Sequence, residues 1–76
     1  MDTAKEVAVI AACQSGDTEQ FGWLYDRYIN RMYAYVFART MHRETAEDLT
    51  SVVFIKALSH LHGYRTGSFR AWLYRI

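Results

Sequence analysis

The feature of this sequence that most constrains its fold is the scarcity of residues that break helices. The chain has no proline, and its four glycines stand at positions 16, 22, 63 and 67, so residues 23–62 contain neither type. Proline and glycine are the strongest local interruptions of regular structure. Apolar residues also recur at three- and four-residue steps, which is the helical period. We therefore predict an all-α fold: a small helical bundle of about four helices, with two long antiparallel helices and short terminal helices.

Capping signals predict where these helices begin and end. We expect helices over residues 5–14, 18–40, about 44–61 and from 69 onward. Asp17 and Thr45 are the expected N-caps of the second and third helices, each forming a capping box with the residue three positions later. The alternative for the third helix is a start one turn earlier. Ser68 is the expected N-cap of the last helix. Gly22, inside the second helix, is expected to permit the close approach of a neighbouring helix.

The predicted third helix has apolar residues on two faces. Its inner face, expected to pack in the core, comprises Ala46, Leu49, Thr50, Val53, Phe54, Ala57 and Leu61. Its outer face comprises Glu44, Glu47, Asp48, Ser51, Val52, Ile55, Leu58 and Ser59. An outer face that mixes acids with aliphatic side chains fits a basic, apolar helix of a partner protein. The alternative is that the last helix covers these aliphatic side chains.

Composition and cysteine usage exclude several classes of protein. With 76 residues, 51% of them hydrophobic, the chain is one small domain and too apolar to be disordered. No apolar run reaches the ~20 residues of a membrane span, and the N-terminus lacks signal-peptide features, so a cytoplasmic protein is expected. Cys13 is alone and is expected in the core. No catalytic constellation, phosphate loop or metal-binding spacing is present in the sequence, so neither an enzyme nor a cofactor is expected.

Charge is distributed unevenly along the chain. All eight acids lie at or before position 48, whereas residues 49–76 carry four cations and no acid. Beyond residue 63 the aromatic residues are Tyr64, Phe69, Trp72 and Tyr74. Rings stack on unpaired bases and cations hold phosphates, a combination suited to single-stranded nucleic acid. Arg70 and Arg75 are the expected phosphate contacts, while Trp72 is expected to pack in the core. The alternative is that the cations are ordinary solvated charges.

Four motifs, in this order and spacing, resemble one known family. They are DTEQFGWLYDRY at 17–28, ETAEDLT at 44–50, VFIKAL at 53–58 and GSFRAWLYRI at 67–76. Together they are similar to region 2 of sigma-70-family RNA polymerase sigma factors of the extracytoplasmic-function group. The resemblance implies that residues 1–76 are one region 2-like domain. It also implies that the C-terminal part of the region and the domain that reads the −35 element lie outside these residues.

The resemblance implies partners and site residues. In that family the A-E-D-L helix docks on the clamp helices of the beta-prime subunit of the RNA polymerase core. The loop and helix that follow engage single-stranded promoter DNA at the melted −10 element, with one base captured by the loop. Combined with the outer face above, the expected polymerase-binding residues are Glu44, Glu47, Asp48, Leu49, Thr50, Ser51, Val52 and Ile55. The expected DNA-binding residues are Tyr64, Arg65, Thr66, Gly67, Ser68, Arg70 and Arg75.

Two functions remain open at this point. The first is a transcription-initiation module that docks on polymerase and engages the −10 element. The alternative is a protein-interaction bundle without DNA selectivity, such as a decoy or a domain that binds an anti-sigma factor. Ser51 and Val52 stand where many family members have Gln-Glu, which shifts the expected docking surface toward apolar packing. Affinity for a single-stranded oligonucleotide distinguishes the two functions.

Overall fold

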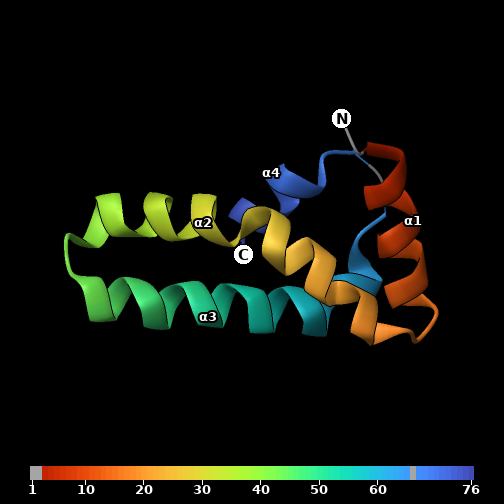
Figure 1. Ribbon diagram of the computed structural model, residues 1–76, viewed down its shortest axis with the longest axis horizontal. Coiled ribbons are helices and arrows are strands. Elements are labelled where there is room, and N and C mark those ends of the chain that lie inside the picture. The colour runs from red at the N-terminus through yellow and green to blue at the C-terminus, as the bar shows by residue number, and fades with distance from the viewer. Residues whose placement is uncertain (1–2, 66) are drawn as a thin grey trace.

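A computed structural model describes residues 3–65 and 67–76 of the chain (Figure 1). The α-helices are α1 (Thr3–Gln14), α2 (Phe21–Thr40), α3 (Arg43–His60) and α4 (Phe69–Tyr74). Two short 3₁₀ helices, η1 (Thr18–Gln20) and η2 (Leu61–Gly63), precede α2 and follow α3. No strand occurs in these ranges. Helices α2 and α3 lie antiparallel, and α1 packs against α2 and η2. The predicted all-α bundle with two long helices is confirmed.

The turn between α2 and α3 explains where α3 begins. Met41 has a left-handed backbone (φ 54°), and its N–H donates to the carbonyl of Phe37 at 2.7 Å, which ends α2. His42 is extended and caps α3, because its ring Nδ1 accepts from the Thr45 N–H at 3.3 Å. The predicted capping box from Thr45 to Asp48 is therefore wrong. The extended residue lies at position 42, so Thr45 is already inside the first turn.

The start of α2 also differs from its prediction. Asp17 makes no side-chain bond to the backbone of the helix. Instead Gln20 Nε2 donates to Asp17 Oδ2 at 3.3 Å, and the chain makes a 3₁₀ turn before α2 starts at Phe21. The expected close approach at Gly22 is wrong too. Apart from its chain neighbours and the backbone of its own helix, a Cβ built there would meet no described atom within 4 Å, because the residue is exposed.

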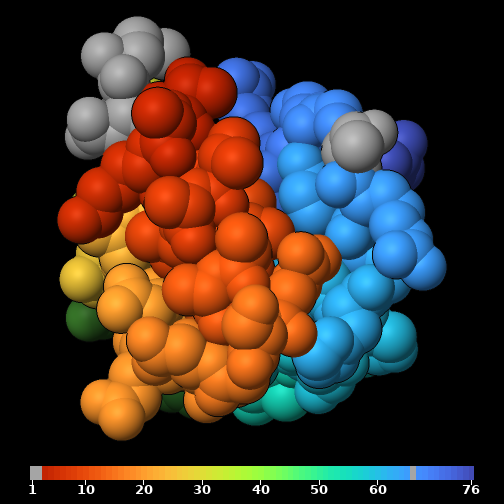
Figure 2. Space-filling view, turned by 90° about the vertical axis from the view of Figure 1, so that its right-hand side faces the viewer, coloured from red at the N-terminus to blue at the C-terminus, as the bar shows by residue number. Residues whose placement is uncertain are grey.

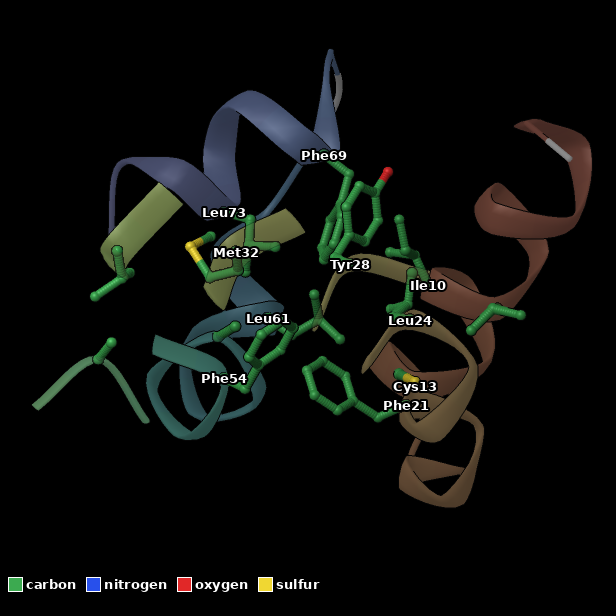
Figure 3. Close-up of a cluster of buried hydrophobic side chains, with 14 residues drawn as sticks. Ile10, Cys13, Phe21, Leu24, Tyr28, Met32, Phe54, Leu61, Phe69 and Leu73 are labelled. Atoms are coloured by element: carbon green, nitrogen blue, oxygen red, sulfur yellow. The ribbon is translucent and has the colours of Figure 1, made fainter. Parts of the chain in front are cut away.

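The core gathers side chains from every α-helix of the described chain (Figure 3). Its members include Ile10 and Cys13 of α1, Leu24 of α2, Phe54 of α3 and Leu73 of α4. Burial of Cys13 confirms its predicted place. That burial raises the pKa of the Cys13 thiol, with a smaller contribution from the charge of Asp17. A buried, protonated thiol is unreactive, as a structural cysteine should be.

The inner face of α3 is largely as predicted, with one exception. Ala46, Thr50, Phe54, Ala57 and Leu61 are buried, and Val53 is half-buried. Leu49 is 45% exposed, so its predicted burial is wrong. It lies at the rim of a groove between α2, α3 and the end of α4, where no described side chain covers it.

Helix α4 begins and packs as its sequence indicates. The Ser68 hydroxyl accepts from the Ala71 N–H at 3.1 Å, which confirms the predicted N-cap. The Phe69 ring lies 5.7 Å from the Tyr28 ring (Figure 3), and the half-buried Trp72 ring lies 5.5 Å from Phe69. None of the helices in the described ranges combines the length and apolarity that a bilayer span requires.

Candidate functional site

The outer face of α3 is uncovered in the folded domain. Glu44, Asp48, Ser51 and Ile55 are all exposed, and their spacing of three and four residues aligns them along one side of the helix. Ile55 is 65% exposed and Val52 is 43% exposed, so α4 does not cover the aliphatic side chains. We call these residues, together with Glu47 and Leu49, the docking strip. At its edge, Arg43 Nε lies 3.8 Å from Glu47 Oε2 in a long, exposed ion pair.

Thr50 differs from the other expected polymerase-binding residues. Its side chain is 2% exposed, and its Oγ1 has no hydrogen-bond partner within residues 3–65 and 67–76. It lines an open pocket of about 400 Å³ between residues 25–33 of α2 and the N-terminal half of α3. The pocket lining also includes Tyr25, Asn30, Tyr33, Glu47 and Ser51. Thr50 therefore lies beneath the docking strip, where a small side chain entering the pocket could approach it.

A second, more apolar hollow lies on the other flank of the docking strip. It measures about 500 Å³ and is formed by α2, α3 and the end of α4. Leu49 and Val52 of the docking strip line one wall, and Tyr35 and Ile76 contribute to the others. The docking strip is thus a ridge between a polar pocket and an apolar groove, a shape that a helical partner can fit.

The loop after α3 is held in place by α1. Gln14 Nε2, at the end of α1, donates to the carbonyl oxygens of Leu61 at 2.9 Å and Tyr64 at 2.8 Å. Figure 2 shows α1 side by side with the segment that runs from η2 toward α4. One amide group thereby satisfies two carbonyls of a loop. Gln14 was missed in the sequence because its partners lie 47 and 50 residues away, and no local signal marks such a contact.

Tyr64 anchors the same loop from inside. Its hydroxyl donates to the Gly67 carbonyl at 2.7 Å. Its ring makes edge contacts with Phe69 at 5.5 Å and Trp72 at 5.6 Å. Burial raises the pKa of the Tyr64 hydroxyl, and the negative charge of Glu6 adds to the shift. The phenol is therefore neutral and donating at physiological pH. Tyr64 therefore has a structural role in the loop, because its ring is engaged by Phe69 and Trp72.

The remaining expected DNA-binding residues lie on the surface. Arg65, Arg70 and Arg75 are exposed. Gly67 has a φ of +96°, a left-handed conformation that side chains disfavour, so the turn into α4 requires glycine. Ser68 is occupied as the N-cap of α4. Thr66 lies outside the described residues. Beside the loop, Glu6, Val7 and Gln14 of α1 form one side of a hollow of about 330 Å³, with Arg65 and Gly67 on the other.

The described residues offer no metal centre. Within residues 3–65 and 67–76, no three His, Cys, Asp or Glu side chains are grouped so as to hold a metal ion. The site residues expected from the sequence lie on two surfaces, the docking strip of α3 and the loop with α4.

Comparison with known proteins gives consistent results. The family model for sigma-70 region 2 matches residues 24–76. The chain is 38% identical over 77 aligned residues to the ECF RNA polymerase sigma factor BldN of Streptomyces coelicolor, an alignment that covers 99% of this chain and 29% of BldN. It is 46% identical over 54 residues to the RNA polymerase sigma factor YlaC of Bacillus subtilis, covering 70% of this chain and 31% of YlaC.

These matches set the scope of the assignment. The chain spans less than a third of the length of each of these two relatives. No solved structure matches the chain. The family match covers α2 from Leu24 onward and all of α3 and α4, and α3 and α4 carry the two surfaces. Sigma factors initiate transcription and are not enzymes. Since the match covers well over half of its residues, the chain belongs to the sigma-70 region 2 family.

Proposed function

We propose that this domain docks on the clamp helices of the RNA polymerase beta-prime subunit and engages the single-stranded −10 element of a promoter. The observation that carries the proposal is the docking strip. Ile55 is 65% exposed although it lies more than a turn from either end of an 18-residue helix. An exposed aliphatic residue with Asp48 two turns before it suits a basic, apolar helix.

The hollows beside the docking strip support a protein partner of helical shape. A helix laid along α3 could place one side chain in the polar pocket and another in the apolar groove. In the polar pocket, a donor from the partner could satisfy Thr50 Oγ1, which has no hydrogen-bond partner among residues 3–65 and 67–76. Such a contact would relieve part of the cost of burying an unpaired hydroxyl.

The loop and α4 support the DNA-binding half of the proposal. Gln14 and Tyr64 fix the loop backbone, so a base could enter the hollow between α1 and the loop without the loop first having to order. Arg65, Arg70 and Arg75 are exposed around this region and are suited to backbone phosphates. The exposed arginines and the fixed loop backbone thus lie on the same part of the surface.

Docking is tested with a synthetic helical hairpin that reproduces the beta-prime clamp helices. Ile55→Asp and Asp48→Arg should each weaken its binding about tenfold, because each removes a central contact of the interface. Val7→Asp is the matched control, since Val7 is 62% exposed but lies on α1. It should leave hairpin affinity unchanged. Failure of the folded wild-type domain to bind the hairpin would contradict the proposal.

DNA engagement is tested with a fluorescent −10-like oligonucleotide titrated at several salt concentrations. Phosphate contacts to a single strand lower log K by about 0.7 per contact for each unit of log salt. We expect a negative slope that corresponds to several contacts. Hairpin binding without any oligonucleotide binding would instead favour the protein-interaction bundle, such as a target of an anti-sigma factor.

A further inference from the structure

Three arginines meet in a pocket that the expected DNA-binding residues do not explain. The pocket measures about 460 Å³ and lies between α1, α2 and α4. Its cations are Arg27 and Arg31 of α2 and Arg70 of α4, and Glu6 is its one acid among the described residues. Figure 1 shows α1 and α4 on either side of α2, and the lining residues come from these three helices. Only Arg70 belongs to the surface discussed above.

The acid in the pocket is already engaged. Glu6 Oε1 lies 3.2 Å from Arg27 Nε and accepts from the Tyr28 hydroxyl at 2.5 Å. Burial, and then this hydrogen bond to Glu6, raises the pKa of the Tyr28 hydroxyl. The Arg27 guanidinium also lies 5.3 Å from the Trp23 ring. The Glu6 carboxylate and the Trp23 ring therefore hold the Arg27 guanidinium in one orientation. A ligand that binds there does not have to order this side chain first.

The other two arginines have no acid of their own. Neither Arg31 nor Arg70 forms an ion pair with a residue in the ranges 3–65 and 67–76, and both side chains are exposed. Three cations against one acid leave a net positive pocket. Guanidinium groups present forked N–H donors that match the oxygens of a phosphate. The chemistry of the pocket therefore fits a phosphate group.

The position of the pocket indicates which kind of phosphate would bind there. Thr3 and Glu6 line both this pocket and the hollow beside the loop, so the two sites adjoin across α1. Because the two sites share these residues, a strand with one base in that hollow could lay its neighbouring backbone over the arginines. We propose that Arg27, Arg31 and Arg70 bind a backbone phosphate of the single strand whose base enters beside the loop. This inference rests on the proposed function.

The test uses a double-mutant cycle between protein and DNA. In a set of −10-like oligonucleotides, one phosphate at a time is replaced by an uncharged methylphosphonate. Each is titrated against the wild type, Arg31→Ala and Arg70→Ala by fluorescence anisotropy. Arg39→Ala is the matched control, because Arg39 is also an exposed arginine of α2 but its guanidinium lies over the Tyr35 ring, 4.6 Å from the centroid. Circular dichroism checks that each variant keeps its helicity.

The expected result is a coupling at one position of the strand. Arg31→Ala and Arg70→Ala should each weaken binding about tenfold and make the salt slope shallower by about 0.7, whereas Arg39→Ala should do neither. One methylphosphonate should weaken the wild type but have little further effect on either variant.

Three outcomes would overturn the assignment. In the first, the wild type binds, but each methylphosphonate weakens the Arg31→Ala variant by as much as it weakens the wild type. The pocket then holds no backbone phosphate, while the proposed function stands. If inorganic phosphate shifts the Arg31 and Arg70 Nε–H resonances but no strand position couples to them, the ligand is a free phosphate. If the wild type binds no oligonucleotide at all, the proposed DNA engagement and this inference both fail.

Discussion

At the scale of single residues, Thr50 lowers the stability of the domain in a way that the proposed docking would explain. Its side chain is buried, and its Oγ1 is unpaired within the described ranges. An unsatisfied buried hydroxyl costs about 1–3 kcal/mol. The free domain therefore carries a cost at the same place where the polar pocket opens beside the docking strip.

Replacing Thr50 with valine should separate these two effects. Thr50→Val keeps the shape and removes the unpaired oxygen, so the free energy of unfolding should rise by about 1 kcal/mol. Hairpin affinity should fall, because the partner loses an acceptor. Urea unfolding followed by circular dichroism measures the first quantity, and titration with the clamp hairpin measures the second.

The control for this prediction is Thr18→Val. Thr18 is exposed in η1, so its replacement should change stability by no more than about 0.5 kcal/mol. If Thr50→Val destabilises the domain, Oγ1 has a partner in solution. If it stabilises the domain but leaves hairpin affinity unchanged, the pocket does not receive a donor from the partner.

Single residues also show what the sequence could predict. Ser68 was correctly predicted as an N-cap because serine is a preferred type and its bond reaches only three residues ahead. The sequence does not predict His42 as an N-cap, because histidine is not among those types. Its ring Nδ1 nevertheless accepts a bond from the Thr45 N–H, as an N-cap side chain does. Leu49 was placed inside by periodicity alone, which cannot tell whether another helix covers the edge of the buried face.

At the scale of elements, α1 serves as a support for the loop. Helices α2 and α3 could be predicted because an uninterrupted helical period runs through them. The role of α1 could not, since Gln14 reaches the carbonyls of Leu61 and Tyr64 across the fold. These bonds and the edge contacts of Tyr64 hold a segment that has little regular structure of its own.

Gln14→Ala should therefore loosen the loop while leaving the helices intact. Loss of the amide removes the donor to the Tyr64 carbonyl and one of the two donors to the Leu61 carbonyl, which also accepts from the Tyr64 N–H. This should cost about 1–2 kcal/mol. Amide hydrogen exchange at Tyr64 and Arg65 should accelerate, and affinity for the −10-like oligonucleotide should fall. Gln20→Ala is the control, because the Gln20 side chain is exposed and, among the described residues, bonds only to the Asp17 side chain. Equal exchange rates in the two variants would show that Gln14 does not hold the loop.

At the scale of the whole molecule, the two proposed interfaces use different parts of the bundle. The docking strip runs along α3, whereas the arginine pocket is lined by α1, α2 and α4. Both surfaces are attached to one shared core, to which all four α-helices contribute. Surface substitutions that leave this core intact should therefore act on one interface without disturbing the other.

The double variant Ile55→Asp with Arg70→Ala tests this separation. Sites without shared partners usually contribute additively, within about 0.5 kcal/mol. Ile55→Asp alone should weaken hairpin binding and spare the oligonucleotide, and Arg70→Ala alone should do the reverse. The double variant should show both losses at their single-variant sizes, measured by parallel titrations of hairpin and oligonucleotide. A deviation well beyond 0.5 kcal/mol would mean that the core transmits a change from one interface to the other, so that docking on polymerase alters how the domain holds DNA.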